Sequence, residues 1–153
     1  MGMRTIFCGI AALAVVGAAA AADKPVFLNS PRALELDRPF SEAVRAGDFL
    51  FLSGQIGEDP ATAKLAEGGI QAESRQTLTN VKRVLESNGA TLADVVKCTV
   101  FLADIAEWPA FNSVYIEFFR QPFPARSALA ASGLALKARV ELECIAYVPR
   151  RTR

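Results

Sequence analysis

The sequence predicts an α+β domain in which two helices cover one face of a mixed β-sheet. Several short runs alternate apolar and polar residues, as strands with one buried face do. Two longer segments instead space their apolar residues three and four apart, which is the helical period. Along the chain the order is strands, helix, strand, helix and two strands, which is typical of an α+β fold. The length of 153 residues fits a single domain.

Three strands are predicted before the first helix. Residues 32–37 form a short possible strand, and residues 40–45 form a second that ends at a glycine turn. The dense apolar run at residues 49–54 predicts a strand that is buried on both faces. Residues 23–31 are a loose lead-in, and residues 57–69 form a glycine-bracketed loop.

The clearest helix is predicted over residues 70–88, and Asn88-Gly89 is a good C-terminal stop for it. The second helix begins near Trp108, because Pro109 suits a first helical turn. Its apolar stripe indicates core packing and consists of Phe111, Val114, Tyr115 and Phe118.

Three further strands are predicted at residues 95–103, 125–131 and 139–148. In the first of them one face is expected to hold Val96, Cys98, Val100 and Leu102. One face of the last strand carries both charged and apolar residues, namely Arg139, Glu141, Glu143, Ile145 and Tyr147. A subunit interface that contains a polar pocket explains both kinds of residue.

Cys98 and Cys144 both lie on predicted core faces. We expect buried free thiols in preference to the disulfide that an exported protein can form. The chain has no histidine and no CxxC motif, so we expect no metal site.

The N-terminal run is typical of a cleaved secretory signal. Residues 5–22 carry no charge and end in small residues, and polar sequence begins at Asp23. We therefore predict a signal peptide at 1–22 and a single mature domain at 23–153. The protein is then periplasmic or secreted, without stable membrane association after cleavage. An uncleaved membrane anchor is the alternative, and a cytoplasmic location follows if the run is not a functional signal.

The distribution of charged residues shows no basic patch of the kind that binds nucleic acid. The chain has 17 Lys+Arg against 16 Asp+Glu, and the two signs are interspersed. The basic residues at the C-terminal end, Arg150, Arg151 and Arg153, fit a solvated tail. We therefore expect no nucleic-acid partner.

Arg126 and Glu141 are the candidate catalytic residues. The guanidinium is a planar, permanently charged fork that fits a carboxylate, and a glutamate can orient or activate a water. The structural alternative is a buried ion pair of Arg126 with Glu141 or Glu143.

Several motifs together resemble the RidA (YjgF-type) family. They span most of residues 40–148 and are Phe51-Leu-Ser-Gly-Gln-Ile56, Asn80-Val81, Val96 to Leu102, Phe111-Asn112 through Tyr115 to Phe118-Phe119, Phe123-Pro-Ala-Arg-Ser127 and Val140-Glu-Leu-Glu143. The resemblance implies a chorismate-mutase-like α+β fold and a homotrimer with active sites between subunits. It also implies that no metal, nucleotide or pyridoxal cofactor takes part.

In the deaminase members of this family, the arginine that matches Arg126 binds the substrate carboxylate, and the glutamate that matches Glu141 positions water. The resemblance places further substrate contacts at Phe40, Ser53, Ala125 and Ser127. It implies hydrolysis of small 2-imino or 2-enamino acids to 2-keto acids and ammonia. A non-catalytic carboxylate-binding protein is the alternative function, and a ribonuclease or translation inhibitor is a third.

The sequence departs from the family pattern at two points. Phe40 replaces a tyrosine that is usual in the deaminases, which removes a hydroxyl group from the expected pocket. Leu134-Ala135 stands where Leu-Pro is frequent, which affects only the rigidity of the loop.

Overall fold

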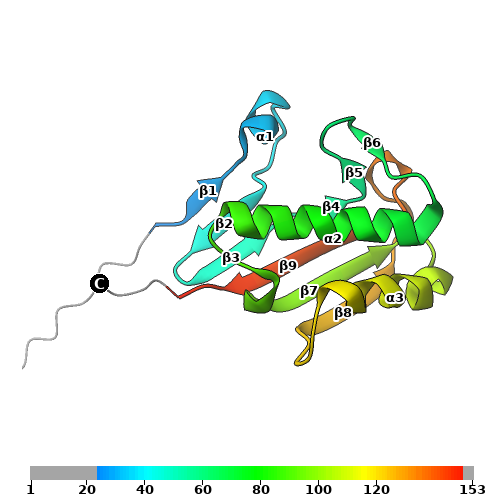
Figure 1. The fold of residues 1–153 in the computed structure, drawn as a ribbon. Helices are drawn as coiled ribbons and strands as arrows, with labels where there is room; N and C mark the ends of the chain where they lie inside the picture. The colour runs from blue at the N-terminus through cyan, green and yellow to red at the C-terminus, as the bar shows by residue number, and fades with distance from the viewer. Residues whose placement is uncertain (1–23, 150–153) are drawn as a thin grey trace, which may run out of the picture.

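A seven-stranded mixed sheet with two long helices on one face forms the scaffold of the protein (Figure 1). The computed structural model describes residues 24–149, so the predicted signal peptide and the basic tail lie outside the described residues. The elements, in chain order, are β1 (Val26–Leu28), α1 (Pro31–Glu35), β2 (Ala43–Ala46), β3 (Phe49–Leu52), β4 (Gln55–Ile56), β5 (Glu58–Asp59), β6 (Lys64–Leu65), α2 (Gly69–Ser87), η1 (Leu92–Asp94), β7 (Val95–Leu102), η2 (Ile105–Glu107), α3 (Trp108–Phe118), β8 (Ala125–Ala130), η3 (Ala135–Lys137) and β9 (Val140–Tyr147).

The strand order of the sheet is β1-β2-β3-β9-β7-β8, and β4 also pairs with β9. Every pairing is antiparallel except that of β7 with β8, which is parallel. A parallel pair needs a crossover connection, and α3 supplies it between β7 and β8. This connection leaves β8 at one edge of the sheet and α3 beside it, which is where the candidate arginine lies.

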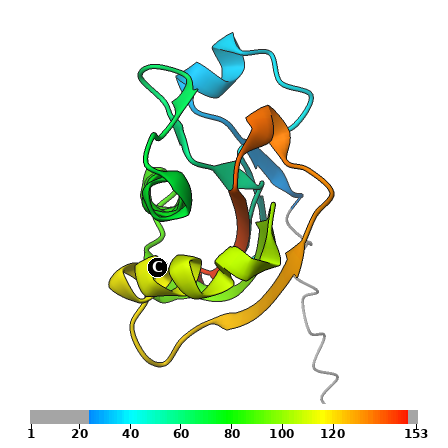
Figure 2. The ribbon, with the colours of Figure 1, turned by 90° about the vertical axis from the view of Figure 1, so that its right-hand side faces the viewer.

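The core lies between the sheet and the two long helices, and Figure 2 shows α2 and α3 on the same side of the curved sheet. The largest fully buried side chains come from both layers and include Leu50, Leu78, Leu85, Val100, Phe111 and Leu142. The predicted α+β class, with two helices on one sheet face, is therefore confirmed. Within residues 24–149, no helix combines the length and apolar character needed to span a bilayer.

The predicted strand at residues 32–37 is wrong, because this segment contains the short helix α1. Ser30 caps the helix by accepting a hydrogen bond from the backbone N–H of Ala33 at 3.2 Å. Pro31 occupies the first helical turn, where its missing N–H has no cost. The alternation of apolar residues in this segment was therefore misleading, and the capping residues decide its structure.

Two strand faces also differ from the prediction. In β3 only Leu50 and Leu52 are buried, while Phe49 and Phe51 are 41% and 42% exposed, so the strand is buried on one face and not on both. In β7 a bulge between Val95 and Lys97 shifts the register against β9. The shift turns Val96 outward, whereas the alternating pattern had placed it in the core.

The remaining predictions agree with the structure to within a few residues at the element ends. Helices α2 and α3 and strands β7, β8 and β9 occupy the predicted segments, and the predicted strand at residues 40–45 shortens to β2. Strand β1 and the small β5–β6 hairpin were missed, because they lie in segments interpreted as lead-in and loop. Short edge strands of two or three residues leave little periodicity to detect.

The expectation of free thiols is wrong, since Cys98 and Cys144 form a disulfide between the adjacent strands β7 and β9. Both cysteines are about 1% exposed and belong to the core. They are direct partners in the antiparallel register, which brings their side chains together on one face of the sheet.

We predict that the disulfide contributes to stability, because it closes a loop between residues 46 positions apart. Replacing both cysteines with alanine should lower the free energy of unfolding by about 2–4 kcal/mol, measured by urea denaturation without reductant. As a control, reductant should destabilise the wild type and leave the double variant unchanged. Alkylation of both Cys98 and Cys144 in the wild type, unfolded without reductant, would contradict the prediction.

Candidate functional site

Arg126 lies on β8 and points to the helix-covered face of the sheet. Its Cα partner on β7 is the buried Cys98, and paired residues in a sheet direct their side chains to the same face. The guanidinium therefore reaches α3, the helix that connects β7 to β8.

The guanidinium of Arg126 is held by neutral groups. It donates a hydrogen bond from an Nη to the amide oxygen of Asn112 at 2.7 Å. Its central carbon lies 4.5 Å from the ring centroid of Tyr115 and 5.7 Å from that of Phe111, both within cation–π range. In the part of the chain that the structure describes, Arg126 forms no ion pair, so the alternative of a pair with Glu141 or Glu143 is wrong for a single chain.

The Tyr115 ring that contacts the Arg126 guanidinium is itself held in place by packing. The side chain is 4% exposed and stacks on Phe119 at a centroid distance of 4.5 Å. Burial raises the pKa of its hydroxyl to about 12, although the nearby charge of Arg126 acts in the opposite direction. The ring therefore remains neutral at physiological pH, and its hydroxyl forms no hydrogen bond with any described residue.

A cleft of about 530 Å³ opens beside Arg126. Its walls come from α3, the segment before β8 and β8 itself, and consist of Trp108, Asn112, Tyr115, Ile116, Phe123, Pro124, Arg126 and Ala128. Among the described residues that line it, Arg126 alone is charged. We call Arg126, Asn112, Tyr115 and this cleft the arginine half-site.

Glu141 lies on the opposite face of the sheet. Its neighbours on β9, Val140 and Leu142, are fully buried against the helices, so alternation directs Glu141 away from them. Its carboxylate sits over Gly54, where an added Cβ would lie 1.9 Å from Oε1 of Glu141. Only glycine leaves room for the carboxylate at this position.

The pKa of Glu141 is raised above its ordinary value, chiefly because the carboxylate is partly buried and secondly because Glu143 is close. Among the described residues, no group donates a hydrogen bond to this carboxylate. A raised pKa and free acceptor oxygens suit a group that takes a proton from water.

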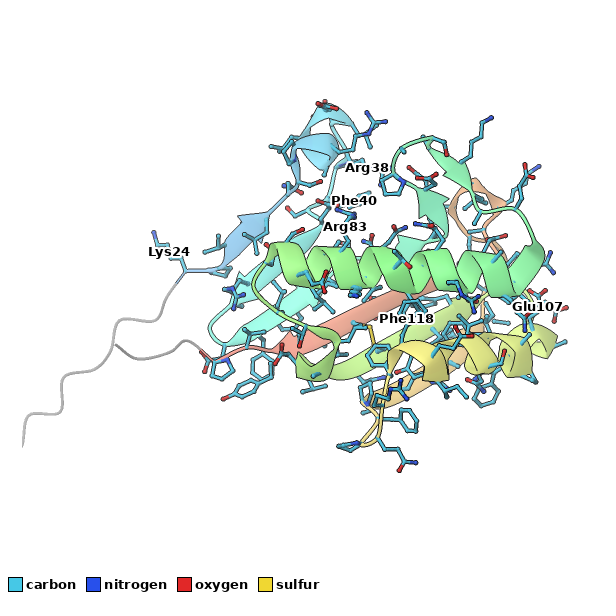
Figure 3. All side chains as sticks on the ribbon, in the orientation of Figure 1. Lys24, Arg38, Phe40, Arg83, Glu107 and Phe118 are labelled. Carbon is cyan, nitrogen blue, oxygen red and sulfur yellow. A yellow bond between two sulfur atoms is a disulfide. The ribbon has the colours of Figure 1, made fainter. Side chains whose placement is uncertain are left out.

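Phe40 and Ser53 are two further predicted contacts, and Ser53 directly precedes Gly54, over which the Glu141 carboxylate sits. Phe40 lines a second cleft of about 340 Å³, which Gly54 also lines, and Figure 3 shows Arg38, Phe40 and Arg83 close together between α1 and α2. The Ser53 hydroxyl donates to the backbone oxygen of Ser41 at 2.7 Å, so its proton already has a structural acceptor. We call Ser53, Gly54 and Glu141 the glutamate half-site.

Ala125 and Ser127 flank Arg126 on β8 and therefore point to the other face of the sheet. There the Ser127 hydroxyl accepts a hydrogen bond from Nζ of Lys97 at 2.9 Å. Within one chain the predicted site residues thus fall on two faces, with Arg126 on one and Glu141 and Ser127 on the other. Their roles as substrate contacts stay predictions.

Sequence reasoning missed the supports of both candidate residues. Tyr115 was assigned to core packing, which is correct, but its ring also carries Arg126. Asn112 and Gly54 were noted only as parts of motifs. Two signals could have indicated the supports of Arg126. One is the polar amide of Asn112 beside the apolar stripe of the helix, and the other is the tyrosine Tyr115 within that stripe. Within residues 24–149, no three histidine, cysteine, aspartate or glutamate side chains gather as metal ligands would.

Comparisons with known proteins agree with this architecture. A family model described as endoribonuclease L-PSP matches residues 30–148. The 2-iminobutanoate/2-iminopropanoate deaminase of Dermatophagoides farinae is 41% identical over 121 residues, covering 79% of this chain and 94% of that protein. The deaminase of the same name from Capra hircus is 44% identical over 108 residues, covering 71% and 79%.

A solved structure shows that the similarity extends to the fold. The crystal structure of RidA from the Antarctic bacterium Psychrobacter sp. PAMC 21119 has a TM-score of 0.70 and 37% identity, covering 73% of this chain and 90% of that one. The resemblance seen in the motifs is therefore confirmed over most of the described chain. This chain belongs to the RidA/YjgF family, which the endoribonuclease L-PSP model represents.

Proposed function

We propose that this chain hydrolyses 2-imino acids to 2-keto acids and ammonia. The observation that carries the proposal is the Arg126 guanidinium, which neutral groups fix at the wall of an open cleft without a carboxylate partner. Relatives that are 41% and 44% identical are named as deaminases of 2-iminobutanoate and 2-iminopropanoate, which supports the same chemistry here.

Arg126 binds the substrate carboxylate through a two-point, charge-assisted pair. Asn112 engages only part of the guanidinium, so further N–H groups remain for the ligand. The flat ring of Tyr115 restrains the plane of the guanidinium without neutralising it. A negatively charged substrate then meets a cation whose position is already set, which lowers the entropic cost of binding.

Glu141 orients and deprotonates the attacking water. Water adds to C2 of the protonated imine, and its proton passes to the carboxylate. Glu141 then returns that proton to the nitrogen of the carbinolamine. The C–N bond breaks as the C2 carbonyl forms, and the proton of the C2 hydroxyl group leaves with the ammonia as ammonium. One water is consumed for each ammonia released, and the chemistry needs neither a change of oxidation state nor a cofactor.

The two half-sites act together only if they come from different copies, because they lie on opposite faces of one sheet. We propose a homotrimer with its sites between subunits. The face away from the helices carries Phe49, Phe51 and Tyr147, each more than 40% exposed. Exposed aromatic residues of this kind favour burial against a second chain. Arg126 lies on the edge strand β8, where a neighbouring copy can approach its cleft.

We also propose that the protein is exported. The N-terminal run resembles a secretory signal, and the Cys98–Cys144 disulfide is of the kind that persists in oxidising compartments. The enzyme would then meet 2-imino acids outside the cytoplasm.

We predict that substituting Arg126 abolishes most of the activity. Arg126→Ala removes the charge, and Arg126→Lys keeps the charge but loses the planar fork. Both should lower kcat/KM by about 100-fold or more, since charge-assisted hydrogen bonds to substrate are lost. The measurement is ammonia release from enzymatically generated 2-iminopropanoate, corrected for spontaneous hydrolysis. Arg75→Lys is the matched control, because Arg75 is exposed on α2 and pairs with Glu117.

The same preparations separate the alternative functions. Thermal stabilisation by keto acids without turnover would indicate a binding protein and contradict the proposal. Cleavage of single-stranded RNA that persists in Arg126→Ala, without imine hydrolysis by the wild type, would likewise contradict it.

We predict that the acid limb of the kcat/KM profile follows Glu141 and lies above the ordinary glutamate pKa of about 4.3. Only the ionised carboxylate accepts a proton, and burial holds its pKa high, so activity is lost as pH falls through that raised value. Glu143→Gln removes the smaller cause and should move the limb to lower pH. A limb that persists unchanged in Glu141→Gln would assign it to another group.

A further inference from the structure

We infer that the imino acid preferred by this chain carries a branched or aromatic side chain. The inference rests on the proposed function and concerns the cleft of the arginine half-site. Three large apolar side chains, Trp108, Ile116 and Phe123, line this cleft together with Arg126.

These three large side chains are substantially exposed. Trp108, Ile116 and Phe123 are 42%, 57% and 46% exposed. Trp108 and Ile116 come from the two ends of α3, and Phe123 comes from the segment that leads into β8. Large apolar groups gathered from separate segments around one hollow mark a binding surface, because each loses contact with water when a ligand enters.

The charge distribution of the cleft selects the ligand. Within residues 24–149, Arg126 is the one charged residue that lines the cleft, and Asn112 and Tyr115 add polar side chains. One guanidinium matches one carboxylate, and the rest of the wall offers hydrocarbon contacts. A ligand with a second charge would lose hydration in this cleft without gaining a partner.

The cleft has room for such a ligand. Its volume of about 530 Å³ lies within the range of about 300–1,000 Å³ that is typical of small-molecule sites. A three-carbon imino acid bound at Arg126 has no side chain long enough to cover much of the apolar wall. The imines of leucine and phenylalanine extend beyond C2 by the branched or aromatic group that this wall can cover. Such imines arise by two-electron oxidation of the corresponding amino acids at the C–N bond.

The test compares imines generated in situ by an amino-acid oxidase from alanine, leucine, phenylalanine and glutamate. For the wild type, kcat/KM should be about tenfold or more higher for the leucine and phenylalanine imines than for the alanine imine. The glutamate imine, with its second charge, should be the poorest of the larger substrates.

Two variants locate the preference in the cleft. Ile116→Ala and Trp108→Ala should lower kcat/KM for the leucine and phenylalanine imines by a larger factor than for the alanine imine. Leu34→Ala is the control, because Leu34 is 65% exposed on α1 and lines none of the clefts described above. Circular dichroism confirms that each variant folds.

The outcomes separate this inference from the proposed function. If the wild type hydrolyses none of the imines, the proposed function itself fails. If its kcat/KM for the alanine imine equals that for the larger imines, only the preference is overturned. If Ile116→Ala changes the oligomeric state and reduces all activities equally, the cleft wall is a subunit contact, and the preference is again overturned.

Discussion

The guanidinium of Arg126 rests on the ring of Tyr115 and donates a hydrogen bond to Asn112, and the chemistry proposed for this chain depends on that contact. A carboxylate in place of either partner would neutralise the cation and compete with the substrate. Neutral partners fix its direction and leave its charge available. The crossover from β7 through α3 to β8 makes the contact possible, because it lays the aromatic stripe of α3 beside the strand that carries Arg126.

The alternation of the sheet imposes the second constraint. Since Arg126 faces the helices and Glu141 faces away, the two side chains lie on opposite faces of the sheet within a single copy. Each half-site nevertheless has its own local support. The ring of Tyr115 packs against the Arg126 guanidinium, and Gly54 leaves room for the Glu141 carboxylate. In the proposed homotrimer, association through the exposed aromatic face and the edge strand brings the two half-sites together.

The long periodic elements could be predicted from the sequence, and the local exceptions could not. Helix α2 repeats its apolar residues over several turns, so its limits are clear, whereas the five residues of α1 depend on the Ser30 cap and on Pro31. The bulge that turns Val96 outward, and the register that joins Cys98 to Cys144, are properties of strand pairing between distant segments. Arg126 and Glu141 were recognised by residue type and motif. The role of Tyr115 was missed, because a buried aromatic stripe has the same period whether or not a cation lies on it.

Mixing two inactive variants tests most directly whether the half-sites come from different copies. Arg126→Ala and Glu141→Ala protomers, each inactive alone, are unfolded together, refolded and assayed for imine hydrolysis. A site between subunits is intact wherever Arg126 comes from one variant and Glu141 from the other, so about one quarter of the sites in a random mixture should recover activity. If the refolded mixture is assembled and remains as inactive as its components, the two residues do not meet across a subunit boundary, and the account of the site is contradicted.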